Sequence, residues 1–171
     1  MRLLQSHSLF RARSRHRTGG VGQRHPAGPV TLRHGADTIV AYIDGGARGN
    51  PGPAGYGVRI ERPDGTVVDE FCESIGVATN NVAEYRGLLA ALEWARDHGH
   101  GHLHVRSDSL LLVQQMLGNY KVKNPRLQPL HAVARLLAHA IGRVTFEHVR
   151  RESNAHADRL ANAAMDEAAG T

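Results

Sequence analysis

The stretch that decides the fold is Thr38-Ile39-Val40-Ala41-Tyr42-Ile43-Asp44-Gly45-Gly46, residues 38–46. Residues 38–43 are mostly apolar, which predicts a strand in the centre of a sheet. We expect the strand to end at Asp44, because the glycine- and proline-dense stretch 45–53 is typical of a loop. An acidic residue therefore stands where a central strand ends.

Two further strands and then a change of period follow this loop. Residues 56–61 and 66–74 read as strands joined by a Pro-Asp-Gly turn at 63–65, so the first three strands form an antiparallel meander. From residue 82 to 95 apolar side chains recur at helical spacing, and residues 79–81 precede them as a cap. The sheet is thus followed by a long helix.

The C-terminal half alternates helices with strands. Its expected elements are a strand at 102–107, a short helix at 109–117, a connector at 119–125, a helix at 127–140, a strand at 144–149 and a helix at 154–167. Strands first and helix–strand units afterwards predict an α/β fold. We expect a five-stranded mixed sheet, an antiparallel meander plus parallel strands, flanked by helices.

Composition narrows the class of protein. The 171 residues are 41% hydrophobic, which suits one domain with a core, and no apolar run approaches the roughly 20 residues of a membrane helix. Cys72 is the only cysteine, so an internal disulfide and a cysteine-based zinc site are excluded. We predict that Cys72 is a small core residue, that the protein is cytoplasmic, and that it has no membrane partner.

The N-terminal segment differs from the rest of the chain. Residues 1–35 carry seven arginines and no acidic residue, whereas the remaining residues carry 14 basic and 16 acidic side chains. We predict a basic, disordered tail over 1–36 and a folded domain over 37–168. The tail could be merely solvated or an over-long start, a flexible arm that binds nucleic acid, or a transit peptide.

Four carboxylates fall where they could meet. Asp44 and Asp108 end two strands, and parallel neighbours would place both at the sheet edge where α/β proteins bind ligands. Glu84 lies in the first turn of the long helix and Asp158 in the second turn of the last helix. Each acid alone could equally be a turn former or a partner of a helix dipole.

Such a cluster predicts a divalent metal site. Like charges would raise the pKa values of clustered carboxyls and cost folding free energy, and bound cations would remove that cost. All-oxygen ligation suits Mg²⁺, with Mn²⁺ possible. Two ions about 4 Å apart could activate a water and stabilise the leaving oxygen in phosphodiester hydrolysis.

The local sequence around these acids resembles the type 1 ribonuclease H family. The opening hairpin, residues 42–57, resembles that of the family, and Thr79-Asn80-Asn81-Val82-Ala83-Glu84-Tyr85, Ser107-Asp108-Ser109 and Asn154-Ala155-His156-Ala157-Asp158 resemble its later motifs. The four motifs occur in family order and cover residues 38–165. The resemblance implies a ribonuclease H fold and cleavage of the RNA strand of RNA–DNA hybrids by a monomer.

The resemblance also implies roles for individual residues. Asp44, Glu84, Asp108 and Asp158 match the metal-binding carboxylates. The matches to substrate-contacting residues are Asn50, Thr79, Asn80 and Asn154. Backbone groups at Gly45 and Gly46 could contact a sugar–phosphate backbone, because glycine lets it come close. Asn50 and its neighbours could equally serve the turn, and Asn80 could simply cap the helix.

The sequence departs from the family in two places. Many members carry a mobile histidine before the last helix, but residues 149–154 contain none, and Arg151 is the candidate replacement. Arginine can bind phosphate but cannot act as a base near neutral pH. The basic, tryptophan-rich protrusion of some members is reduced to Lys121 and Lys123, so Trp94 is predicted to lie in the core.

Three functions remain open at this point. Hydrolysis of RNA–DNA hybrids is the leading hypothesis, and the substrates could include double-stranded RNA. A non-catalytic module that binds hybrids or double-stranded RNA is the alternative, and it predicts an incomplete set of acids. A DNA-cutting relative with the same sheet would not be expected to carry the Asn-Pro-Gly-Pro hairpin of residues 50–53.

Overall fold

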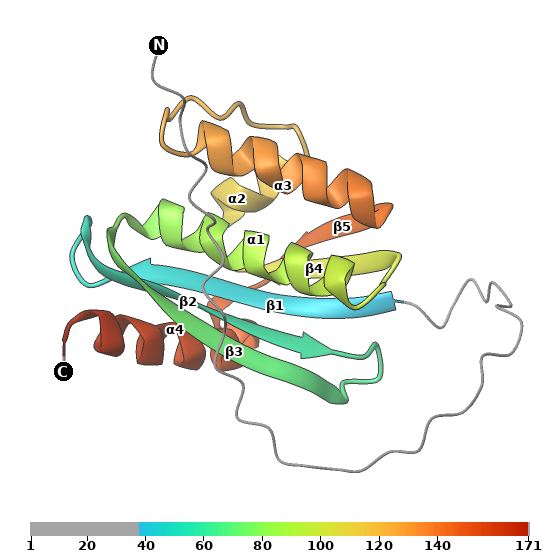
Figure 1. Cartoon of the computed structure of the whole chain (residues 1–171), viewed down its shortest axis with the longest axis horizontal. Helices are drawn as coiled ribbons and strands as arrows, with labels where there is room; N and C mark the ends of the chain where they lie inside the picture. The colour runs from blue at the N-terminus through green and yellow to red at the C-terminus, as the bar shows by residue number, and fades with distance from the viewer. Residues whose placement is uncertain (1–37, 171) are drawn as a thin grey trace, which may run out of the picture. The chain divides into compact units, whose positions relative to one another are not determined.

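Residues 38–170, which this computed structural model describes, fold into a five-stranded sheet with helices on both faces (Figure 1). The strands are β1 (Thr38–Ala47), β2 (Gly52–Glu61), β3 (Val67–Ala78), β4 (His102–Ser107) and β5 (Arg143–His148). The helices are α1 (Asn80–Asp97), α2 (Leu110–Met116), α3 (Gln128–Ile141), the 3₁₀ helix η1 (Arg151–Asn154) and α4 (Ala155–Ala168).

The sheet has the order β3-β2-β1-β4-β5, with β1 in the centre. β1 is antiparallel to β2 and parallel to β4, and β4 is parallel to β5. The predicted fold class, a meander joined to parallel strands, is therefore confirmed. The central position of β1 explains its apolar sequence, since Ile39, Ala41 and Ile43 are all buried.

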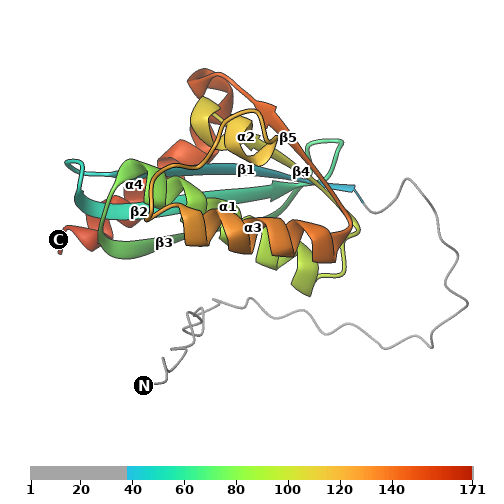
Figure 2. The ribbon, with the colours of Figure 1, turned by 90° about the horizontal axis from the view of Figure 1, so that it is seen from above.

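The helices form two layers around the sheet. α4 packs on one face, against β1, β2 and β3, and α1 packs on the other face with α3 beside it (Figures 1 and 2). The main core lies between the sheet and α1, where Leu88, Leu92 and Trp94 are buried together with the apolar side chains of β1. The prediction that Trp94 is a core residue is confirmed, because only 4% of it is exposed.

The loop expected at residues 45–53 is much shorter than predicted. β1 continues through Gly45 and Gly46, which pair with Tyr56 and Gly55, and the turn occupies only residues 48–51. Glycine is required here by packing: a Cβ on Gly45 would lie 2.4 Å from the backbone carbon of Ala83 in α1. The absent side chain lets the sheet and the helix approach closely.

α4 reaches the opposite face of the sheet by the same means. A Cβ on Gly57 would lie 2.5 Å from Cβ of Leu160, and a Cβ on Gly55 would lie 2.5 Å from Cβ of Ala164. The helix meets these glycines with the buried small residues Ala157, Ala161 and Ala164. This close packing brings the first turn of α4 next to the centre of the sheet.

The structure corrects the prediction for Cys72 and leaves the predictions for the N-terminal tail untested. Cys72 is exposed rather than in the core, and it lies on the edge strand β3. The predicted tail, residues 1–36, lies outside the described residues, so its three interpretations and the domain boundary stay predictions. None of the described helices is both long and apolar enough to cross a membrane.

Candidate metal centre

The parallel pairing of β1 with β4 brings two of the carboxylates together. Ile43 pairs with Ser107, so the residues that follow them, Asp44 and Asp108, emerge at the same edge of the sheet. Glu84 of α1 joins them, and one oxygen from each of these three carboxylates lies within 4.8 Å of the other two. The sequence predicted this meeting of Asp44, Glu84 and Asp108.

Glu84 occupies a different place on its helix from the one predicted. Thr79 is the N-cap residue, with its side chain accepting the backbone N–H of Val82 at 3.3 Å. Glu84 is therefore the fifth residue of α1, beyond the first turn. Its position against β1 depends on Gly45, because an added Cβ there would lie 2.5 Å from the backbone nitrogen of Glu84.

The cluster is electrostatically strained in the metal-free protein. Burial, the charge of Asp108 and a side-chain hydrogen bond with Asp158 together raise the pKa of Asp44 to about 7. Burial and then the charges of Asp44 and Asp108 raise the pKa of Glu84 well above its ordinary value. Burial also raises the pKa of Asp108, although the neighbouring Arg151 opposes that increase.

Asp158 lies beside the cluster without completing it. It is in the first turn of α4 rather than the second, because α4 begins at Ala155, one residue later than predicted, and Asn154 belongs to the 3₁₀ turn η1. Its hydrogen bond to the Asp44 side chain shows that the two carboxyl groups are in contact. The group of three that could share one ion comprises Asp44, Glu84 and Asp108, and Asp158 is next to it.

The residues present fit a hard divalent cation. All the candidate ligand atoms are carboxylate oxygens, which is the donor set that Mg²⁺ and Mn²⁺ prefer. Glu84 Oε2 is buried and has no hydrogen-bond partner among the described residues. An ion at this position would coordinate that oxygen and would offset the burial and the repulsion that raise the pKa values.

Asn154, a predicted substrate contact, is buried beneath the site. Only 1% of it is exposed, and its Nδ2 donates a 2.8 Å hydrogen bond to the backbone carbonyl of Ile43. It ends η1 and directly precedes α4, so it ties the start of the Asp158 helix to the residue before Asp44. Its Oδ1 is buried without a hydrogen-bond partner among the described residues.

The side chains of Asn50 and Asn80 form hydrogen bonds with the backbone beside the site. Asn80 Oδ1 accepts the backbone N–H of Ala47 at 2.8 Å, and Asn50 Oδ1 accepts the backbone N–H of Asn80 at 3.1 Å. Both amide oxygens are thus used within the protein, which leaves the two Nδ2 groups as donors toward solvent or substrate. Their roles as substrate contacts stay predictions, with this restriction to hydrogen-bond donation.

The remaining predicted residues lie around the carboxylates. Arg151 is 85% exposed in its side chain and has its Nε 3.9 Å from Asp108 Oδ2. Gly45 donates its N–H to Asp44 Oδ1 at 2.9 Å, and a Cβ on Gly46 would meet the side chain of Met165 at 3.2 Å. Gly45 is therefore needed for packing, whereas a side chain at Gly46 would require only a small shift of the Met165 side chain. Contact of either glycine with substrate stays a prediction.

His148, which is not among the predicted site residues, is a neighbour of the site. Its Nε2 lies 3.2 Å from the backbone carbonyl of Asp108, at the end of β5. The signal was available in the sequence, since His148 stands at the carboxyl end of a parallel strand as Asp108 does. The positioning role of Asn154 had no such signal, because it depends on a contact across 111 residues.

The chain matches a family model and several proteins of known structure. Residues 42–164 match the family described as reverse transcriptase-like. The ribonuclease HI of Halobacterium salinarum is 44% identical over 99 residues, which are 58% of this chain and 50% of that protein. The RNase H domain of Rv2228c from Mycobacterium tuberculosis is 51% identical in its solved structure, with a TM-score of 0.75, over 78% of this chain and 96% of that one.

This chain belongs to the ribonuclease H family. A further solved member, LC11-RNase H1 in complex with an RNA/DNA hybrid, is 45% identical, with a TM-score of 0.73, over 77% of this chain and 99% of that one. The aligned part spans half or less of the curated relatives, because it covers 50% of the Halobacterium ribonuclease H and 28% of the bifunctional protein Rv2228c.

Protonation of Asp44 should make stability depend on pH in this ribonuclease H. Its pKa is about 7 in the folded protein and 3.8 as the ordinary value, so the folded state keeps a proton that the unfolded state loses between these values. Without metal, the free energy of unfolding should therefore fall as pH rises through this window and level off above it. The stabilisation by Mg²⁺, measured as the increase in Tm over EDTA, should grow across the same window. Asp44→Asn should flatten both trends, and an equal Mg²⁺ effect at about pH 5 and pH 8 would contradict the assignment.

Asn154→Ala should weaken both the fold and the metal site. The buried carbonyl of Ile43 would lose its partner, at a cost of about 1–3 kcal/mol in the free energy of unfolding. Affinity for Mn²⁺, measured by calorimetry on the folded protein, should fall by about tenfold as Asp44 and Asp158 lose their common support. Asn119→Ala is the matched control, because Asn119 Nδ2 donates to Gln114 Oε1 at an exposed position outside the carboxylate cluster. Unchanged Mn²⁺ affinity in Asn154→Ala would reduce Asn154 to a purely structural role.

Proposed function

We propose that this chain is a metal-dependent endonuclease that hydrolyses the RNA strand of RNA–DNA hybrids. The observation that carries the proposal is the three-carboxylate cluster, whose buried Glu84 oxygen lacks a partner among the described residues. Two comparisons support the substrate: the Halobacterium relative is a ribonuclease HI, and LC11-RNase H1 is solved with an RNA/DNA hybrid. We expect the cation to be Mg²⁺, and we expect two ions rather than one when substrate is bound.

Each group in the site has a part in this reaction. Asp44, Glu84 and Asp108 would hold the divalent cation, with Asp158 beside them; when bound, the cation supplies Lewis acidity and neutralises charge on the phosphate. Arg151 keeps a permanent positive charge at the rim of the cluster, suited to binding a phosphate oxygen. The Nδ2 groups of Asn50 and Asn80 can donate to oxygens of the RNA strand.

A non-catalytic hybrid-binding module is the alternative function. Such a module would tolerate loss of a carboxylate, whereas all four are present and three converge on one point. The convergence favours catalysis, because a binding surface for polyanions gains nothing from buried acidic groups. Cleavage of double-stranded RNA, a monomeric state and a cytoplasmic location stay predictions beside this proposal.

The segment between Asp108 and Glu147 carries positive charge and no negative charge. Residues 109–146 contain no acidic residue, and their basic side chains are Lys121, Lys123, Arg126, Arg135 and Arg143. Lys121 and Arg135 line a cavity of about 540 Å³ between α2 and the first turns of α3. We propose that this basic segment binds the backbone of the second strand in place of a longer protrusion.

Asp44→Asn should abolish cleavage of the RNA strand and leave the fold intact. The substitution removes a charged ligand while keeping the shape of the side chain, so metal-supported catalysis should fall by at least about a thousandfold. The measurement uses end-labelled RNA in three forms: annealed to DNA, single-stranded, or paired with RNA. Each form is incubated with Mg²⁺, Mn²⁺ or EDTA. Hybrid binding without cleavage by the unaltered chain would support the binding module instead. Retained cleavage in Asp44→Asn would contradict the metal centre.

Replacing Lys121 and Arg135 together by Ala should weaken substrate binding without slowing turnover. If each contacts one phosphate, KM should rise and the slope of log affinity against log salt should fall by about 0.9 per lost contact. kcat at saturating hybrid should stay within about twofold, because neither side chain contacts the carboxylates. Arg96→Ala is the matched control, since Arg96 lies at the far end of α1 and pairs with Asp97. An unchanged salt slope in the double variant would count against the proposed strand contact.

A further inference from the structure

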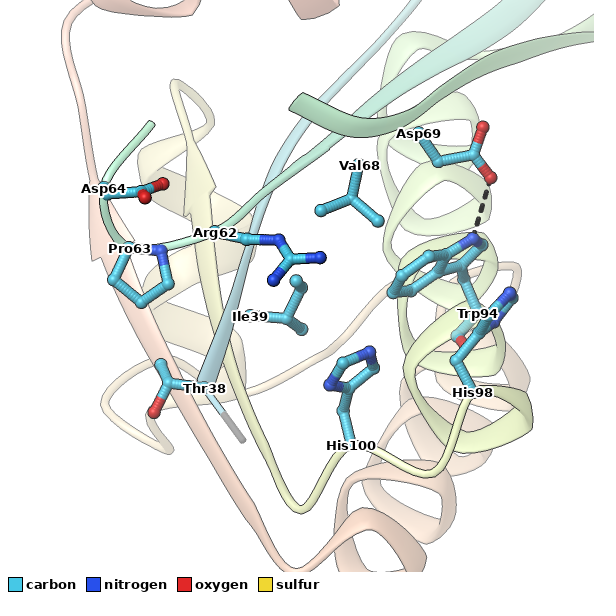
Figure 3. Close-up of a pocket in the computed structure, with 10 residues that line it drawn as sticks. All are labelled: Thr38, Ile39, Arg62, Pro63, Asp64, Val68, Asp69, Trp94, His98 and His100. Atoms are coloured by element: carbon cyan, nitrogen blue, oxygen red, sulfur yellow. Dashed lines mark hydrogen bonds between the residues drawn. The ribbon is translucent and has the colours of Figure 1, made fainter. Parts of the chain in front are cut away.

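A second cavity lies at the opposite end of β1 from the metal centre. It has a volume of about 560 Å³ and is enclosed by the start of β1, the turn between β2 and β3, and the end of α1 (Figure 3). Thr38 and Ile39 line it, six and five residues before Asp44 on the same extended strand. At about 3.3 Å per residue, the two sites are separated by roughly 20 Å.

One wall of this cavity is a fixed aromatic stack. The Trp94 indole is stacked with the His98 ring at 4.0 Å between ring centres and with the His100 ring at 5.4 Å, at interplanar angles of 16° and 10°. Trp94 Nε1 donates a 2.9 Å hydrogen bond to Asp69 Oδ2, which holds the indole in place. Because only 4% of Trp94 is exposed, a further planar ring could stack only on the partly exposed His100 ring, which the indole holds parallel to itself.

The facing wall carries a guanidinium whose hydrogen-bonding groups are unused. Arg62 extends from the β2–β3 turn toward the His100 and Trp94 rings (Figure 3). Within residues 38–170 its guanidinium has no hydrogen bond or ion pair, although its backbone N–H donates to Thr66. The nearby Asp64 accepts the backbone N–H of Thr66 at 2.9 Å and attracts Arg62 electrostatically without forming an ion pair with it, so the guanidinium N–H groups can still bind an anion.

This combination of groups selects a class of ligand. The apolar floor at Ile39, which is 3% exposed, and the stacked rings suit an aromatic ring rather than a sugar or a metal ion. Arg62 suits one anionic group, whereas Asp64 and Asp69 would repel a highly charged polyphosphate. The same carboxylates can accept hydrogen bonds from amino groups on a base. A cavity of this size is within the range of about 300–1,000 Å³ that holds small organic ligands.

We propose that this cavity is a binding site for a nucleoside monophosphate, separate from the metal centre. The base stacks against the His100 ring, the phosphate pairs with Arg62, and the amino group of the base donates to Asp69 or Asp64. Guanine offers two adjacent donors to a carboxylate and uracil only one, so GMP should bind more tightly than UMP. The proposal does not depend on the nuclease activity, because none of these groups belongs to the carboxylate cluster.

The only tryptophan of the chain provides a direct test. The full-length protein in EDTA is titrated with GMP, AMP, UMP, inorganic phosphate and ribose 5-phosphate, and Trp94 fluorescence and equilibrium dialysis are recorded in parallel. We expect saturable binding of GMP, and of AMP more weakly, with a change in fluorescence. Asp44→Asn should bind GMP as the unaltered chain does, which separates this result from the fate of the proposed nuclease function.

Two variants decide whether the observed binding is at this cavity. Arg62→Ala should weaken GMP binding by at least about tenfold, because it removes the partner of the phosphate. Arg96→Ala should leave GMP affinity unchanged, since Arg96 is nearby but does not line the cavity. The proposal is overturned if no GMP binding is detected by dialysis up to about 10 mM, a very weak affinity. Phosphate binding as tightly as GMP, or Arg62→Ala binding GMP normally, would overturn it as well.

Discussion

Asp44, Glu84 and Asp108 repel one another whenever they are ionised, and the rest of the fold holds them together against that repulsion. No single element could do so, because the three residues come from β1, α1 and the end of β4. The parallel ladder between β1 and β4 fixes two of them, and the missing Cβ of Gly45 lets α1 bring the third into reach. The raised pKa values of Asp44 and Glu84 measure how strongly this arrangement opposes full ionisation without a cation.

The polar residues around the carboxylates mainly serve this frame. Asn154 connects the start of α4 to the carbonyl of Ile43, while Asn50 and Asn80 connect the turn after β1 to the start of α1. Each amide uses one of its polar atoms inside the protein and keeps the other for a different partner. A substrate that contacted Asn50 or Asn80 would therefore meet side chains whose positions are already fixed, which reduces the entropy lost on binding.

The sequence predicted most elements and the cluster itself, because both depend on local pattern. The apolar run 38–43 and the helical spacing of 82–95 gave the correct element types, and acids after two parallel strands had to emerge at one edge. The errors came from contacts distant in sequence. Stretch 45–53 was assigned to a loop because glycine usually breaks strands, but Gly45 serves the packing of α1. Cys72 was assigned to the core because a strand pattern does not tell an edge strand from a central one. The burial of Asn154 could not be derived either, since the carbonyl it binds belongs to a distant strand.

Arg151 stands in the last loop, where residues 149–154 contain no histidine, and it affects the charge at the site. Arg151 is charged at every accessible pH and is largely exposed, so it can bind an anion without being able to accept a proton. Its charge opposes the increase in the pKa of Asp108 that burial causes, which helps to keep Asp108 ionised and ready to bind a cation. His148, whose ring lies 3.2 Å from the Asp108 carbonyl, is an ionisable imidazole at the same rim. The rim beside Asp108 thus carries a permanently charged loop residue that can hold an anion and an imidazole that contacts the backbone of Asp108 itself.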